Sequence, residues 1–307
     1  MKILAWAAFL LNLAISPCFL SLSYAKAIPT AQKSVADLSD LKKGLKPTDL
    51  KSHIFELKEA VDRLKDYSFD HIQKERFGDE LGPLMKIRVK YSQGRIYLHM
   101  LEGPKQNAEV IFKPGWNDGK VKVHKGSFPD IAVSVQPHGS LMMDTQHHPV
   151  EFLDFQVIVN TLVASARRCE RFPGAGIKEV ASPTTQAVDS DLITLELQAP
   201  WIEKENVVGQ DEDIWSFAKR MGSDPYLILH NNGLKDIGDI SSGMQLKVPE
   251  CYATRTLLTL NRKTHLPVQL ITYDGKGRLY ETYDWQNFDT KPLSDIDFDP
   301  DNQEYHF

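Results

Sequence analysis

The densest run of side chains that could do acid–base or metal chemistry is residues 144–151, with the sequence DTQHHPVE. Histidines beside carboxylates can exchange protons or bind a transition metal. Consecutive residues, however, point to different faces of a helix or strand, and the H-E-x-x-H spacing of zinc enzymes is missing. We therefore interpret the run as structural: Asp144 or Thr145 caps a helix that begins near Pro149, and the histidines lie in the connection. If the chain were a hydrolase, its available groups would be His147, His148, Asp144 and Glu151.

No other motif points to catalysis or to a cofactor. The Walker A, G-x-S-x-G and G-x-G-x-x-G patterns are absent from the sequence. An EF-hand loop needs Gly at its sixth position and Glu at its twelfth, but counting from Asp295 these positions hold Pro300 and His306. We expect a non-catalytic protein with no cofactor and no metal ligands. Its acidic tail over 289–307 should dock as irregular structure, with solvated carboxylates in place of a calcium loop.

The composition excludes a nucleic-acid binder and fits an ordinary globular protein. The 307 residues include 36 Lys and Arg against 41 Asp and Glu, which gives a formal net charge of −5. The basic residues are scattered among acids and form no run that could follow a phosphate backbone. The length suits one large domain or two ordinary ones.

Residues 1–27 have the pattern of a secretory signal peptide. Lys2 gives a short positive start, residues 3–22 are largely apolar, and an A-x-A pattern ends at Ala27. We expect cleavage after Ala27 or after Ala25, and the alternative is an uncleaved anchor. A flexible lead-in over 28–46 follows, and no later stretch is long and apolar enough to span a bilayer. These features predict a periplasmic protein of a Gram-negative envelope.

Signal cleavage would leave two cysteines, Cys169 and Cys251. An even number in an exported chain indicates one disulfide, and two separate buried thiols are the alternative. The bridge would close a loop of about 80 residues and stabilise the fold by roughly 4 kcal/mol on the chain-entropy model. Cys18 lies inside the signal, where the preceding Pro17 argues against lipidation.

The hydrophobic periods predict an α+β fold. Helices are expected over 47–65 and 150–169, and a loop rich in Pro, Gly, Ser and Thr over 173–189. The expected strands are 68–77, 85–91, 95–101, 109–113, 120–125, 131–135, 191–197, 255–260, 266–273 and 278–285. Most of the connections between them are too short for crossover helices, so the strands form an antiparallel sheet. We predict a curved antiparallel sheet, a half-barrel, wrapped on helices.

Residues 207–249 show a different, self-contained pattern of strand, helix, helix and strand. Asp211 or Asp213 can cap its first helix, Gly222 ends that helix, and Asp224 can cap the second. The pieces D-E-D-I-W-S-F-A-K-R, N-N-G-L and I-S-S-G-M-Q-L-K-V-P resemble the LysM domain, a βααβ unit. The resemblance implies binding of N-acetylglucosamine glycans, meaning peptidoglycan or chitin. The implied glycan-binding residues are Gln210, Asp211, Glu212, Asp213, Asn232, Gly233, Leu234 and Ile240. Asp211, Asp213 and Ser242 depart from the usual residues of the family.

The rest of the chain is similar to a bacterial family of exported proteins of unknown function that resembles the LolA-like half-barrel. The segments that carry this similarity lie at 75–77, 86–90, 97–101, 147–149, 266–268 and 297–307. Half-barrels of that kind often hold acyl chains or lipoproteins in the concave face. We therefore predict a discontinuous half-barrel domain over 47–199 and 252–307, with the LysM-like unit, residues 200–251, inserted between two of its strands.

These observations predict a non-catalytic envelope protein that binds peptidoglycan, or another N-acetylglucosamine polymer, through the LysM-like unit. Two alternatives stay open. One is a peptidoglycan hydrolase anchored by that unit, and the other is a carrier of an acyl chain or lipoprotein in the half-barrel groove.

Overall fold

The computed structural model describes residues 50–129, 131–181 and 191–307, and it confirms the mixed α+β class with a large curved antiparallel sheet. The expected signal peptide and lead-in lie outside the described residues. The strands of the large sheet are β1 (Asp66–Phe77), β2 (Glu80–Leu81), β3 (Met85–Ser92), β4 (Arg95–Glu102), β5 (Glu109–Phe112), β6 (Val121–His124), β7 (Ala132–Val135), β8 (Gly176–Val180), β9 (Leu192–Gln198), β12 (Arg255–Asn261), β13 (Pro267–Tyr273) and β14 (Leu279–Asp289).

Sequence-distant strands meet at the middle of this sheet. Its order is β7-β6-β5-β4-β3-β1-β14-β13-β12-β9-β8, with β2 paired to β1. The first half is a meander, as the short connections predict. The later strands return to the same sheet because β14 pairs antiparallel with β1. This junction of β1 and β14 positions the candidate site.

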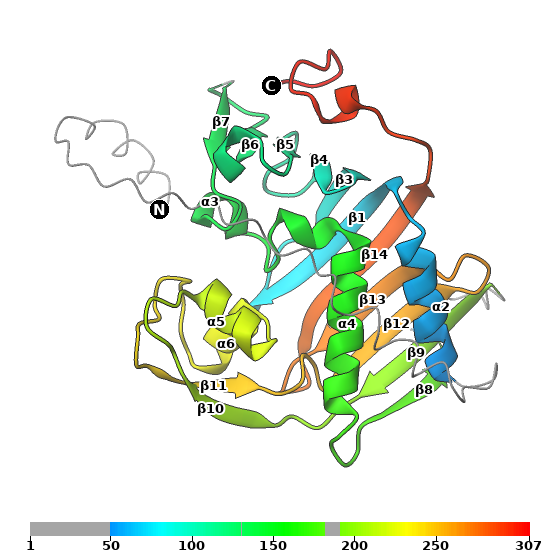
Figure 1. The fold of residues 1–307 in the computed structure, drawn as a ribbon, viewed down its shortest axis with the longest axis vertical. Helices are drawn as coiled ribbons and strands as arrows, with labels where there is room; N and C mark the ends of the chain where they lie inside the picture. The colour runs from blue at the N-terminus through cyan, green and yellow to red at the C-terminus, as the bar shows by residue number, and fades with distance from the viewer. Residues whose placement is uncertain (1–49, 130, 182–190) are drawn as a thin grey trace. The chain divides into compact units, whose positions relative to one another are not determined.

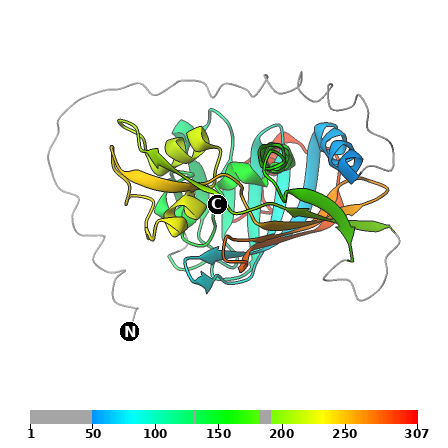
Figure 2. The ribbon, with the colours of Figure 1, turned by 90° about the horizontal axis from the view of Figure 1, so that it is seen from below.

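Two helices, α2 (Leu50–Asp62) and α4 (Phe155–Cys169), cover one face of the sheet (Figures 1 and 2). Their apolar stripes pack on the inward side chains of the strands. Phe155 of α4, for example, is fully buried with its ring centroid 4.9 Å from that of Phe69 in β1. The main core therefore lies between the helices and the sheet.

The prediction of one helix over 150–169 is wrong, because the helix is interrupted at Asp154. A single 3-10 turn, η3 (Val150–Leu153), comes first, and α4 starts after Asp154. The Asp154 carboxylate accepts from the backbone N of Gln156 at 2.8 Å and from the hydroxyls of Tyr67 and Tyr91 at 3.1 and 2.9 Å. Asp154, rather than Asp144 or Thr145, is thus the helix cap.

One further expectation is corrected and another is confirmed. The segment predicted as loop over 173–189 contains β8, in which Ile177 pairs with Leu197 and Val180 pairs with Thr194 of β9. The C-terminal tail docks, as expected, and does so through buried and stacked rings. Phe298, in the turn η4 (Asp295–Phe298), is fully buried, and the Tyr305 ring stacks on Tyr97 at 3.9 Å between centroids. Burial of Phe298 and stacking of Tyr305 therefore hold the tail on the sheet, although the tail is rich in acidic residues.

Residues 203–249 form the predicted strand–helix–helix–strand unit. It comprises β10 (Glu203–Val207), α5 (Ile214–Met221), α6 (Pro225–Asn231) and β11 (Gln245–Pro249), and β10 pairs antiparallel with β11. Asp213 caps α5, Gly222 ends it with a φ of 63°, and Asp224 caps α6. The first strand begins four residues earlier than the predicted Val207. A separate hydrophobic cluster fills the unit, hereafter the βααβ unit.

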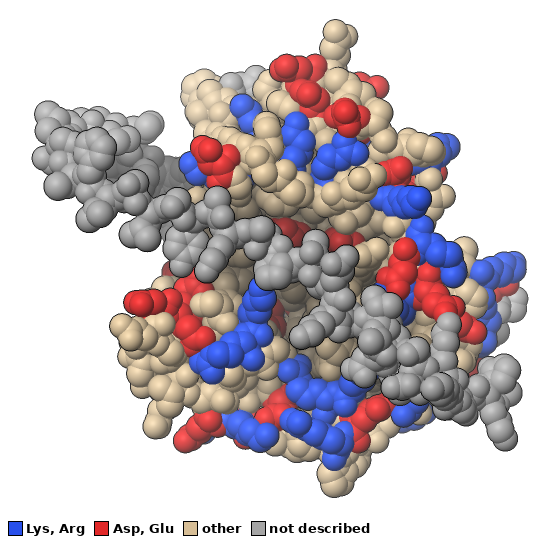
Figure 3. Space-filling model, in the orientation of Figure 1, with Lys and Arg blue, Asp and Glu red and all other residues tan. Residues whose placement is uncertain are grey.

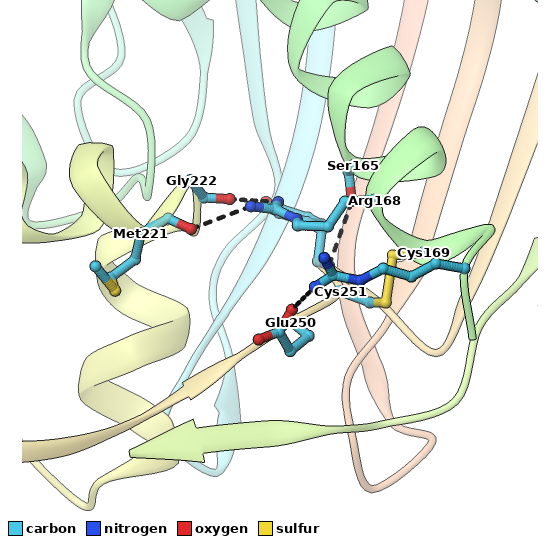
Figure 4. Close-up of a disulfide and its surroundings, with 9 residues drawn as sticks. Ser165, Arg168, Cys169, Met221, Gly222, Glu250 and Cys251 are labelled. Atoms are coloured by element: carbon cyan, nitrogen blue, oxygen red, sulfur yellow. Dashed lines mark hydrogen bonds and ion pairs between the residues drawn. A yellow bond between two sulfur atoms is a disulfide. The ribbon is translucent and has the colours of Figure 1, made fainter. Parts of the chain in front are cut away.

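The C-terminal end of α4 is bonded to this unit (Figure 4). The predicted disulfide Cys169–Cys251 is present, with its Cα atoms 5.8 Å apart. Arg168 donates to the carbonyl oxygens of Met221, at 3.1 Å, and of Gly222 at the end of α5. A side chain at Gly222 would collide with that guanidinium. The βααβ unit is therefore clamped to α4 as well as joined to it by the chain.

Candidate functional site

The two histidines of the 144–151 run point into the molecule, and His147 is completely buried. Its Nε2–H donates to the backbone carbonyl of Arg76 at 2.8 Å, and its Nδ1 lies 3.1 Å from Oε1 of Glu281. The Tyr226 ring of α6 stacks on the imidazole at 5.0 Å between centroids. The interpretation of this run as a simple connection is therefore incomplete.

His148 reaches the same carboxylate oxygen. Its Nε2 lies 3.1 Å from Oε1 of Glu281 and 3.2 Å from the Tyr252 hydroxyl. Its Nδ1 lies 3.6 Å from Oδ2 of Asp224, the cap of α6. Both rings reach one carboxylate because the backbone between α3 (Ser140–Met143) and η3 is irregular, so the alternation of a regular helix or strand does not apply.

Two buried glutamates face each other across the central strand pair. Glu75 of β1 and Glu281 of β14 are directly opposite in the antiparallel register, and each is 2% exposed or less. The Tyr283 hydroxyl donates to Glu75 at 2.7 Å, and the Tyr252 hydroxyl donates to Glu281 at 2.6 Å. The backbone N–H of His147 also donates to Glu75. Like charges so placed repel unless cations or protons lie between them.

The electrostatics of this cluster follow from burial and from the paired charges. Burial lowers the pKa of an imidazole, but Glu281 and Asp224 outweigh it and raise the pKa of His148 to about 9. Burial likewise opposes charge on Glu281, but His148 and His147 hold the pKa of that carboxyl below its usual range. Burial is the main cause that raises the pKa of Glu75 and of Asp224. Of the three carboxyl groups, Glu281, which contacts both imidazoles, therefore ionises most readily.

The metal-ligating capacity of the cluster is greater than the sequence indicated. One oxygen each from Glu75 and Glu281 and a ring nitrogen of His147 all lie within 4.8 Å of one another. Of the acids expected to accompany the histidines, Asp144 instead pairs with Lys105, and Glu151 lies 3.7 Å from His138. The missed residues carry a signal in the sequence only as acids at inward positions of strands, where apolar residues are usual.

A second polar group lies beside this cluster on the inner face of β1 and β14. His71 and Gln73 of β1 face Trp285 and Tyr283 of β14. The Nε2–H of His71 donates to Gln73 at 2.8 Å, and burial lowers the pKa of His71 to about 4. Among the described residues, His71 Nδ1, Gln73 Nε2 and Trp285 Nε1 are buried without a hydrogen-bond partner. One acceptor, His71 Nδ1, and two donors, Gln73 Nε2 and Trp285 Nε1, are therefore free to bond to a polar ligand or to water.

From this polar end, the inner face becomes apolar across the sheet. One cross-strand row runs from Gln73 to Tyr283, Leu270, Leu258 and Leu195, through β14, β13, β12 and β9. Above the apolar strands, Ile158, Leu162 and Val163 of α4 pack on the core but stay partly exposed, as do Ile54 of α2, Ile177 of β8 and Leu197 of β9. The face is thus amphipathic, with unburied apolar side chains at one end.

The predicted glycan-binding residues lie in the βααβ unit, and several have internal roles. Glu212 pairs with Arg220, and Asp213 accepts from Ser216 N at 2.7 Å as the cap of α5. Asn232 bonds the backbone of Lys247 in both directions. Leu234 and Ile240 pack on the unit's own core. The exposed residues that remain are Gln210, Asp211 and Gly233.

The surface and the described helices add two facts. Lys, Arg, Asp and Glu are interspersed over the face shown in Figure 3, without a region of one sign. Within the described ranges, no helix combines the length and apolarity needed to cross a membrane.

Comparison with known proteins gives a family match and loose structural likenesses. Residues 64–206 match the family DUF1571, described as a protein of unknown function. No curated protein matches the chain. The match ends inside β10, so the LysM-like identity of the βααβ unit stays a prediction.

Three solved structures illustrate the likeness. A LolA superfamily protein from Nitrosomonas europaea is 10% identical, with 81% of this chain and 96% of that chain covered and a TM-score of 0.29. The Mycobacterium tuberculosis lipoprotein LppX is 9% identical, with 79% and 96% covered and a TM-score of 0.38. MucB in the Pseudomonas aeruginosa MucA/MucB complex is 11% identical, with a TM-score of 0.36 over 81% of this chain and 59% of that chain. Scores of this size describe a loose likeness in the arrangement of sheet and helices.

Proposed function

We propose that this chain is an exported, non-catalytic carrier of the cell envelope that binds an acyl chain, or the acylated end of a lipoprotein, against the inner face of its sheet. The observation that supports this proposal best is the change from polar to apolar along that face. An amphiphile has the same division, with oxygen atoms at one end and methylene groups along the rest.

The polar end offers hydrogen bonds that the protein itself leaves unused. The Gln73 amide and the Trp285 indole can donate to a carbonyl oxygen, and His71 Nδ1 can accept from a hydroxyl. Leaving such buried groups unpaired costs about 1–3 kcal/mol each, so a ligand that pairs them gains affinity.

The apolar end offers contact for the chain of the ligand. Ile158, Leu162 and Val163 lie on the helix that covers the sheet and keep part of their surface exposed. Each methylene group that they remove from water contributes about 0.8 kcal/mol. Two covered methylene groups therefore change affinity by roughly tenfold.

Titration with a fluorescent long-chain fatty acid tests the proposal. Leu162→Trp puts a bulkier side chain at a partly exposed position of the helix over the apolar strands and should weaken binding about tenfold or more. Thr161→Trp is the matched control, because Thr161 is the preceding residue of α4 and is exposed. Equal affinities of the two variants and the native chain, or no binding by any of them, would reject the carrier.

A second candidate function is glycan binding by the βααβ unit. It is favoured by the predicted order of strands and helices, by the separate core of the unit and by the exposed Gln210 and Asp211. In this account the unit holds the protein on peptidoglycan, and its clamp to α4 sets the orientation of the sheet.

Sedimentation with purified peptidoglycan tests the second candidate. The native chain should pellet, and the double variant Gln210→Ala/Asp211→Ala should pellet much less. Lys219→Ala, an exposed change on α5 outside those loops, serves as the control. A native chain that stays in the supernatant would exclude glycan anchoring without touching the carrier proposal.

A further inference from the structure

The buried histidine–glutamate cluster has the composition and geometry of a metal centre. We propose that Glu75, His147 and Glu281 form a binding site for a divalent transition-metal ion of the zinc type. This inference is independent of the carrier and glycan proposals, because it concerns the junction of β1 and β14 and no ligand of either.

The first argument is the position of the carboxylates. Glu75 and Glu281 are opposite in the β1–β14 ladder, and both are buried. A buried carboxylate pair in this arrangement requires a cation or a proton for each negative charge. A metal ion between them would supply two positive charges at one point.

The second argument is the orientation of His147. Its Nε2–H donates to the Arg76 carbonyl at 2.8 Å, so in a neutral imidazole the lone pair is on Nδ1, which lies 3.1 Å from Glu281 Oε1. A ring nitrogen lone pair and a carboxylate oxygen 3.1 Å apart repel unless a proton or a metal ion lies near both. Metal-binding histidines commonly donate their other N–H to a carbonyl or carboxylate in this way.

The third argument is the fit of the ligand atoms. The three ligand atoms lie within 4.8 Å of one another. Around zinc, with bonds of about 2.0–2.2 Å, tetrahedral ligand atoms are roughly 3.3–3.5 Å apart. Side-chain shifts on the order of 1 Å therefore close the site. The nitrogen ligand favours zinc and its neighbours over calcium or magnesium, which prefer oxygen.

The fourth argument is the count of charges in the cluster. Glu75, Glu281 and Asp224 offer three negative charges, whereas the imidazoles of His147 and His148 offer at most two positive charges. A divalent ion on the three ligands would add two positive charges at the point where the carboxylates of Glu75 and Glu281 face each other.

Such a site would join four parts of the chain. Its ligands come from β1, β14 and the connection before η3, and His148 continues to Asp224, the cap of α6. The tyrosine hydroxyls on Glu75 and Glu281 hold the carboxylates in place. Full burial of His147 makes a structural ion more consistent with the geometry than a catalytic one.

The test uses the untagged chain, freed of metal with a chelator and then dialysed against Co²⁺ or Zn²⁺. We expect one metal ion per chain by elemental analysis, visible absorption of bound Co²⁺, and a melting temperature that rises by about 5 °C or more with metal. Less than a tenth of an equivalent bound, with an unchanged melting temperature, would overturn the site and leave a proton-neutralised network in its place.

Two conservative variants and a matched control separate metal binding from hydrogen bonding. Glu281→Gln and Glu75→Gln keep size and hydrogen-bonding atoms, and each should lower bound metal at least tenfold. Glu109→Gln is the control, because Glu109 is an equally buried glutamate that accepts from a tyrosine hydroxyl, Tyr97 Oη at 2.8 Å. Metal retained by Glu281→Gln at the native level would also overturn the site. If a variant does not fold, chelation and re-addition in the native chain still decide the question.

Discussion

Asp224 joins the βααβ unit to the sheet, and its removal should cost more than the removal of an ordinary helix cap. Its Oδ1 accepts from Leu227 N at 2.8 Å and from the buried Tyr280 hydroxyl at 3.1 Å. Loss of the cap costs about 1 kcal/mol, and an unpaired buried hydroxyl costs about 1–3 kcal/mol. Asp224→Ala should therefore lower the free energy of unfolding by about 2–4 kcal/mol.

Asp213→Ala is the matched comparison. Asp213 caps α5 as Asp224 caps α6, but it is exposed and its carboxylate bonds to Ser216 within its own helix. Its removal should cost about 1 kcal/mol. Urea unfolding of the oxidised proteins at neutral pH, followed by circular dichroism, measures both values.

The difference between the two alanine variants, about 1–3 kcal/mol, reports the contacts of Asp224 outside α6. Asp224→Asn keeps a good capping residue and should lose less than half as much as Asp224→Ala. Equal costs of Asp213→Ala and Asp224→Ala, within about 0.5 kcal/mol, would refute the inference that the unit is built into the sheet through this residue.

Three further outcomes are expected. Replacing both Cys169 and Cys251 by Ala should lower the free energy of unfolding in urea by about 2–4 kcal/mol, because the bridge closes a loop of 82 residues. Burial opposes charge on Asp70, but its hydrogen bond to Arg88 holds the pKa of Asp70 below the ordinary value of 3.8. Because the pKa is lower in the folded state, the ionised carboxylate stabilises the fold above pH 3.8, and this stabilisation is lost as the pH falls. The cost of Asp70→Asn should therefore shrink in urea titrations as the pH falls below 3.8. Phe298→Ala should cost about 3–4 kcal/mol and speed hydrogen exchange of the C-terminal tail, because the ring is fully buried.

Local sequence signals predicted the elements well where one interaction dominates. The caps Asp213 and Asp224, the left-handed Gly222 and the Cys169–Cys251 bridge all depend on residue type and short-range spacing. The meander strands follow from alternation and turn residues. These features need no knowledge of the distant chain.

The candidate site could not be assembled from the sequence because its parts meet only after long-range pairing. Glu75 and Glu281 are brought together by the register of β1 and β14, which no local pattern specifies. The two tyrosine hydroxyls that bind the Asp154 carboxylate could not be predicted, because Tyr67 and Tyr91 lie on strands more than sixty residues away. The alternation of side chains in regular elements does not tell how His147 and His148 point, because both lie in an irregular connection.

The most direct test of the central proposal is native mass spectrometry of the chain after incubation with a long-chain fatty acid and removal of the excess. The carrier account predicts a complex with one acyl ligand in the native chain and in Thr161→Trp, and a loss of about tenfold in Leu162→Trp. Masses of the unliganded chain alone, at every fatty-acid concentration, would contradict it.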